Sequence, residues 1–243
     1  MLGSWKQAKS IAFLEWKMSF WKSIFSLLIV FTVYTSLILF TYSMSDRAVG
    51  IADVLFILLF TFVPTWCKPK EFQYQQINGN LWASPSIVMI QNLPITKDVI
   101  IKSRLILYFF HSFPIQLLTL VLIYILSEEI QLAVSPVSYF VFIIIWLSFG
   151  IYVGYGVVTT DTGTKASHTG KLTVFLGFFV LIALLLLVAS FPIFFQHGIV
   201  EWSMIIAQRY PFLSTTISIV FVCLGIQYWK AIMKKTMNQV DYL

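Results

Sequence analysis

Residues 92–104 read Asn-Leu-Pro-Ile-Thr-Lys-Asp-Val-Ile-Ile-Lys-Ser-Arg and close the one long polar interruption in an otherwise apolar chain, which begins at Lys68. Ahead of them, Ser84-Pro85 offers a helix N-cap and a first-turn proline. The apolar residues 87–90 follow, and the Leu93-Pro94 step disfavours helical backbone just before the proline. The pattern predicts a short helix that ends before residue 93.

A second helix is predicted to begin after Thr96. Threonine is a suitable N-cap, and Asp98 then lies in the first turn, where a negative charge suits the helix dipole. Lys102 and Arg104 come just before a long apolar run, as basic residues do at the cytoplasmic edge of a membrane span. We therefore expect the short helix at the cytoplasmic mouth of a hydrophobic bundle, where a soluble partner can reach it.

The composition predicts an integral membrane protein. Of the 243 residues, 59% are hydrophobic and 11% are charged, which is too little polar surface to cover a soluble globule, and several uncharged runs are long enough to cross a bilayer. The net charge of +6 does not indicate nucleic-acid binding, because the basic residues fall between the apolar runs. Cys67 and Cys223 lie at the end of one apolar run and inside another, which indicates neither a disulfide framework nor a zinc site.

Six apolar runs predict an all-α, polytopic fold in a single domain, residues 1–243. The predicted transmembrane helices cover residues 23–45, 51–67, 105–127, 136–160, 172–195 and 211–229. In the fourth span, Gly150 and Gly154 have the spacing that lets another helix approach closely, and we expect that helix to belong to the same chain. Asp53 is expected at the outer headgroup level and His111 in a hydrogen bond within the bundle; an ion or proton relay is the alternative for each.

Two segments outside the spans are expected at the membrane surface. Residues 5–22 mix lysines with aromatic residues, which is typical of an interfacial helix whose Trp5, Trp16 and Trp21 rings lie among the headgroups. Residues 192–210 are too apolar for a solvated loop and too interrupted for a span, so they predict an interfacial or re-entrant segment on the outer side. An N-terminus in the cytoplasm leaves only Arg47 and Arg209 of the sixteen basic residues outside, so both termini are expected to be cytoplasmic.

The short helix and the Leu-Pro-Ile-Thr-Lys-Asp-Val-Ile-Ile-Lys that follows it resemble the loop between spans two and three of ABC-2-type permeases, the membrane subunits of ABC exporters. The resemblance implies that the short helix is a coupling helix, which docks in a groove on a separate ATP-binding subunit. The contact residues that it implies are Ile87, Ile90, Gln91, Leu93, Pro94, Thr96 and Lys97. One departure is that residues 70–80 carry a single acidic residue, where many members of the family have an acidic segment.

The resemblance also implies the partners and the activity. Two ATP-binding subunits would pair with two permeases, this chain and an identical or related one, in the plasma membrane. The cargo would be amphipathic peptides or lipid-like molecules, as in small members of the family from Gram-positive bacteria. The re-entrant outer hairpin before the last span is also a feature of the family. This chain would bind no cofactor, since ATP and magnesium belong to the partner.

Other functions fit the sequence less well. Residues 163–172 resemble a phosphate-binding loop only faintly, because Lys165 and Leu172 stand where that loop needs a glycine and a hydroxyl. Glu128-Glu129 begins a membrane-protease motif that lacks its arginine, so we expect no catalysis. An ion-driven transporter is disfavoured because the spans carry almost no charge. A non-transporting structural, immunity or regulatory membrane subunit remains the alternative.

Overall fold

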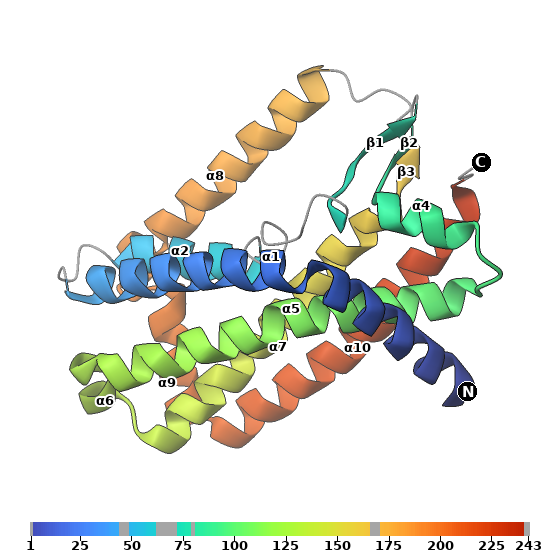
Figure 1. Ribbon diagram of the computed structural model, residues 1–243. Helices are drawn as coiled ribbons and strands as arrows, with labels where there is room; N and C mark the ends of the chain where they lie inside the picture. The colour runs from blue at the N-terminus through green and yellow to red at the C-terminus, as the bar shows by residue number, and fades with distance from the viewer. Residues whose placement is uncertain (1, 44–48, 62–71, 79–80, 166–170, 241–243) are drawn as a thin grey trace.

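The computed structural model describes residues 2–43, 49–61, 72–78, 81–165 and 171–240. These residues form a bundle of helices with one small sheet at its end (Figure 1). The helices are α1 (Leu2–Ser43), α2 (Val49–Thr61), α4 (Pro85–Gln91), α5 (Lys97–Leu126), α6 (Glu128–Ala133), α7 (Pro136–Asp161), α8 (Lys171–Phe195), α9 (Ile199–Arg209) and α10 (Pro211–Gln239). The strands are β1 (Gln75–Asn78), β2 (Leu81–Ala83) and β3 (Thr164–Lys165).

Five of the described helices are long and apolar enough to cross a membrane. The segments are Phe20–Phe40, Lys97–Leu126, Pro136–Asp161, Phe178–Phe195 and Pro211–Gln239. The prediction of a largely helical chain with several apolar spans is thus confirmed. A shorter apolar helix, Gly50–Thr61, covers the first part of the predicted second span; the rest of that prediction, including Cys67, lies outside the described residues.

Two helices are longer than predicted. The expected interfacial helix and first span form one continuous helix, α1, because residues 4–43 contain neither proline nor glycine to end it. Similarly, α10 continues through the basic tail to Gln239. Figure 1 shows the N-terminus of α1, the start of α5 and the end of α10 gathered at one end of the bundle, with α6 and α9 at the other.

A small sheet that was not predicted accompanies the helices. It is antiparallel with the strand order β1-β2-β3. Gln75 lies opposite Ala83, and Trp82 lies opposite Thr164. The sheet therefore connects the segment before α4 to the segment that follows α7.

Two clusters form the apolar core of the described residues. Near α6 and α9, Phe56 and Phe60 of α2 pack against Phe142 and Trp146 of α7. Near α4, a second cluster joins residues of α5, α7 and α10 around the buried Tyr108. Burial of this apolar and aromatic surface stabilises the contacts among α2, α5, α7 and α10.

Gly150 and Gly154 allow α7 to approach other helices of the same chain. A Cβ on Gly150 would lie 2.7 Å from Gln116 Oε1 and 2.8 Å from Phe60 Cδ1, and a Cβ on Gly154 would overlap the Tyr108 side chain. Both neighbours on α5 are buried, so little room is left for either to move away. Only glycine fits at these two positions with the present helix spacing.

We expect Gly154→Ala to lower the free energy of unfolding by about 1–3 kcal/mol, because the added methyl group overpacks a site that Tyr108 already fills. The measurement is unfolding of the purified protein in detergent by a graded denaturant. Gly3→Ala is the matched control, since nothing lies within 4 Å of the Cβ it would add. Equal stability of the two variants would contradict the close approach of α7 to α5.

Candidate functional site

The candidate site is the surface formed by α4 and the following residues 92–98, at the bundle end that also holds both termini (Figure 1). Ser84 has extended backbone and Pro85 is the first residue of α4, which ends at Gln91. The predicted short helix is thus confirmed. The Ser84 hydroxyl does not cap the helix; it lies 2.9 Å from the Ser86 hydroxyl.

The structure corrects which apolar side chains α4 exposes. Ile87 and Ile90 are 0% and 9% exposed, buried against the rest of the chain, so they do not present the accessible apolar surface that a partner contact requires. Met89 and Leu93 are 71% and 53% exposed instead. Residues four apart share one side of a helix, and so Met89 and Leu93, just past the end of α4, form the accessible apolar pair of this surface.

The other predicted contact residues differ in their exposure to solvent and in their hydrogen bonds. Pro94 and Thr96 are exposed, and Gln91 is half-buried. Lys97 is exposed, but its Nζ donates to the Met237 carbonyl oxygen at 2.9 Å and to Asn238 Oδ1 at 3.0 Å. Lys97 therefore ties the start of α5 to the end of α10, where a positive charge suits the helix dipole.

A buried charged network anchors α4 to three long helices. Arg104 of α5 donates from Nη2 to Glu15 Oε1 of α1 at 2.5 Å and from Nη1 to the Ser86 hydroxyl of α4 at 3.2 Å. The Ser84 backbone N–H donates to the Asp161 carbonyl oxygen of α7 at 3.3 Å. These contacts join α4 directly to α5 and α7, and through Arg104 to α1.

The Glu15 carboxyl is shielded from water in this network. Burial raises its pKa, and the neighbouring positive charge of Arg104 opposes that rise. A buried ion pair of this kind gains little net free energy, whereas the loss of one partner is costly because the other charge stays buried. The pair joins α1 to α5.

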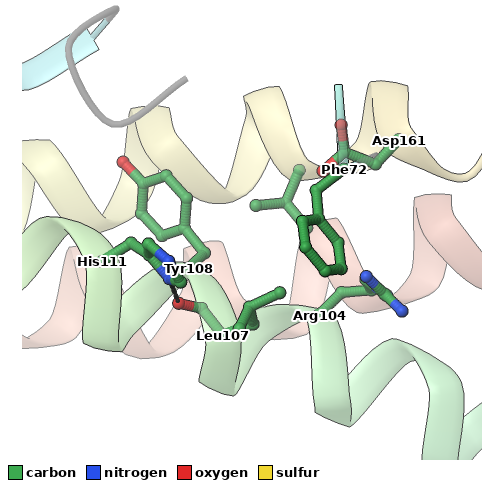
Figure 2. Close-up of a pocket in the computed structure, with 7 residues that line it drawn as sticks. Phe72, Arg104, Leu107, Tyr108, His111 and Asp161 are labelled. Carbon is green, nitrogen blue, oxygen red and sulfur yellow. Dashed lines mark hydrogen bonds between the residues drawn. The ribbon is translucent and has the colours of Figure 1, made fainter. Parts of the chain in front are cut away.

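A small cavity lies beside Arg104. It is lined by Phe72, Arg104, Leu107, Tyr108, His111, Val158 and Asp161. Figure 2 shows the Phe72 ring between Asp161 and Arg104. The cavity measures about 20 Å³, room for about one water molecule. His111 Nδ1 lies 2.8 Å from the Leu107 carbonyl oxygen, which confirms the expected hydrogen bond within the bundle. This cavity is too small to hold a cargo molecule.

Asp53 has a structural partner at the opposite end of the bundle. Its side chain is fully buried and accepts hydrogen bonds from the backbone N–H groups of Ile199 at 2.7 Å and Val200 at 2.8 Å. These are the first residues of α9, where unpaired N–H groups and the helix dipole favour a negative charge. Asp53 thus caps the start of α9, and its expected position at the outer headgroup level stays a prediction.

We expect Asp53→Asn to destabilise the protein by about 1–2 kcal/mol, since the amide has a single acceptor oxygen for the two N–H donors of α9. Thermal unfolding in detergent and hydrogen exchange at Ile199 and Val200 are the measurements. Asp98→Asn is the control, because Asp98 is exposed and its ion pair with Lys102 lies at the surface, in the next turn of the same helix. Unchanged exchange in α9 would contradict the capping role.

The outer segment and the interfacial helix are only partly described by the structure. The segment predicted as interfacial or re-entrant contains the end of α8 and the helix α9, and a re-entrant path stays a prediction. Trp5 and Trp21 are exposed on α1, and Trp16 packs edge-on against Phe20. Their position among lipid headgroups also stays a prediction.

No metal site is found in the described part of the chain, where no group of three or more histidine, cysteine or acidic side chains could hold an ion. The segment compared with a phosphate-binding loop lies partly outside the described residues. Comparisons with protein-family models, curated proteins and solved structures give no match to this chain. The function must therefore be argued from the sequence and the geometry.

Proposed function

We propose that this chain is the permease subunit of an ATP-driven ABC exporter in the plasma membrane of a Gram-positive bacterium. It would have six spans, with residues 51–67 as the second, and both termini in the cytoplasm. The observation that carries the proposal is the surface around α4. It exposes Met89 and Leu93 and is held by Arg104 of α5, which also pairs with Glu15 of α1.

A coupling element must be both accessible and firmly attached. Met89, Leu93 and Pro94 supply an exposed apolar surface of the kind that inserts into a groove on another protein. The contacts of Arg104 and Ser84 supply the attachment to α1, α5 and α7. When two ATP-binding subunits close on ATP, a docked α4 would move as a lever and shift these three helices together.

The apolar surface of α8 can bind a second permease and form part of a path for an apolar cargo. The apolar segment Phe178–Phe195 of α8 is not buried within the chain, and Figure 1 shows α8 inclined away from the other long helices. Lipid or a second permease chain, identical or related, must cover it. Aromatic and aliphatic walls between two such chains would favour amphipathic peptides or lipid-like molecules over polar solutes.

The experiment is reconstitution of this chain with a candidate ATP-binding subunit. We expect the purified chain alone to hydrolyse no ATP. The complex in proteoliposomes should hydrolyse ATP and move an amphipathic peptide, and a non-hydrolysable ATP analogue should stop the movement. A stable complex that hydrolyses ATP without moving cargo would favour the regulatory alternative. ATPase activity that persists in the chain after every co-purifying ATPase is removed would overturn the proposal.

A further inference from the structure

A cluster of two lysines and a tryptophan joins three helices at the bundle end that holds the termini. Lys102 Nζ of α5 and Lys230 Nζ of α10 lie 5.0 Å and 5.1 Å from the centre of the Trp5 ring of α1. Lys102 also bonds to Ser4 Oγ at 2.8 Å and Asp98 Oδ2 at 2.5 Å. Among the described residues, no carboxylate pairs with Lys230. The cluster therefore has an excess of positive charge.

An apolar groove begins at this cluster. Its volume is about 270 Å³, and it is lined by Trp5, Lys230 and by side chains of α5, α7 and α10 that include Phe109, Tyr155 and Ile226. Each helical residue advances about 1.5 Å, so Phe109 lies about 10 Å deeper along α5 than Lys102. Ile226 likewise precedes Lys230 by one turn of α10. The groove thus runs from the charged end into the apolar body.

The positive cluster and the apolar groove match the headgroup and the acyl chains of a membrane lipid. An apolar cavity of about 150 Å³ is enough to bind benzene, and a larger apolar groove accepts part of an acyl chain. An ammonium group without a carboxylate partner binds phosphate oxygens. Tryptophan lies at the level between acyl chains and headgroups.

We propose that this groove binds an anionic phospholipid, with an acyl chain against Phe109 and Ile226 and the phosphate at Lys230. Lys102 and Trp5 complete the site: the first adds to the positive potential, and the second covers the junction between headgroup and chain. A soluble phosphate compound would leave the apolar groove unfilled, and a neutral lipid would leave the excess charge unbalanced. The inference requires only that the chain is embedded in a membrane, so it can fail or succeed independently of the transport proposal.

The test is lipid binding to the purified full chain in detergent, measured by native mass spectrometry. Phosphatidylglycerol and phosphatidylcholine with identical acyl chains are the probes, and the readout is the ratio of their dissociation constants. A lysine near an anionic lipid contributes about fivefold to binding. We expect phosphatidylglycerol to bind at least about fivefold more tightly than phosphatidylcholine. The K230Q variant should show a preference about fivefold smaller.

K234Q is the matched control. It removes the same charge from an exposed position one turn further along α10, so the preference should persist in it. Equal losses in K230Q and K234Q would show diffuse attraction to basic residues and overturn the site. I226W, which narrows the groove, should weaken both lipids, and unchanged binding of both would overturn the acyl-chain assignment. Competition by inorganic phosphate as effective as that by the lipid would also overturn it.

Discussion

Arg104→Met is expected to lower the free energy of unfolding by about 3–5 kcal/mol, because it leaves the Glu15 carboxylate buried without its guanidinium partner. The variant also loses the hydrogen bond from Arg104 to Ser86. Hydrogen exchange across α4 should therefore rise more than exchange across α9. Denaturant unfolding in detergent measures the first effect, and exchange mass spectrometry measures the second.

The loss of stability in Arg104→Met should become larger as the pH rises. Burial raises the pKa of Glu15, and the charge of Arg104 opposes the rise. Without Arg104 its charge no longer opposes the effect of burial, so the folded variant binds a proton at Glu15 more tightly than the unfolded chain does. Its deficit in stability should be smallest below the ordinary Glu value of 4.5. The deficit should grow as the pH increases through the raised pKa of the folded state.

Two further variants separate this effect from loss of a surface charge. Arg209→Met removes an exposed arginine at the other end of the bundle, and its stability should stay within about 0.5 kcal/mol of the parent. The double variant Glu15→Leu, Arg104→Met removes both charges, so it should recover most of the loss. A double variant as unstable as Arg104→Met alone would contradict the ion pair as the cause.

Local signals explain which parts of the fold could be predicted. Ser135-Pro136 predicts the start of the fourth span, and α7 begins there, with the Ser135 hydroxyl accepting from the Ser138 N–H at 3.3 Å. Ser84-Pro85 likewise predicts the start of α4. Caps and first-turn prolines act within a few residues, so a single sequence reveals them. The small sheet has strands of two to four residues, too short for an alternating pattern to show.

The anchors of the candidate site could not be predicted because their partners are distant in sequence. Arg104 and Glu15 are 89 residues apart, and Asp53 is 146 residues from Ile199. In the sequence, Arg104 follows the pattern of a charge at the end of a span, and nothing nearby indicates a buried acid. The exposed side of α4 was not predictable either, since residues 87–90 are all apolar and only tertiary packing determines which of them are buried.

The corrected surface changes which substitutions should break the complex with the ATP-binding subunit. Met89→Glu and Leu93→Glu should each lose about 2–4 kcal/mol of binding free energy, which is roughly 30-fold to 1000-fold in the dissociation constant. Both side chains are exposed in the isolated chain, so membrane expression and thermal stability should remain unchanged. The measurements are co-purification of the partner and binding by titration in nanodiscs.

Ile87→Glu and Ile90→Glu should behave differently from these two. Each places a charge in the interior of the protein. Each should therefore lower the amount of folded protein, rather than the affinity of the folded protein for its partner. Leu132→Glu is the control for an exposed apolar residue, since Leu132 is 90% exposed on α6 at the far end of the bundle. It should bind the partner normally. If Met89→Glu and Leu93→Glu bind the ATP-binding subunit as tightly as Leu132→Glu does, the surface of α4 is not the docking site, because a charge placed in a desolvated contact cannot leave the affinity unchanged.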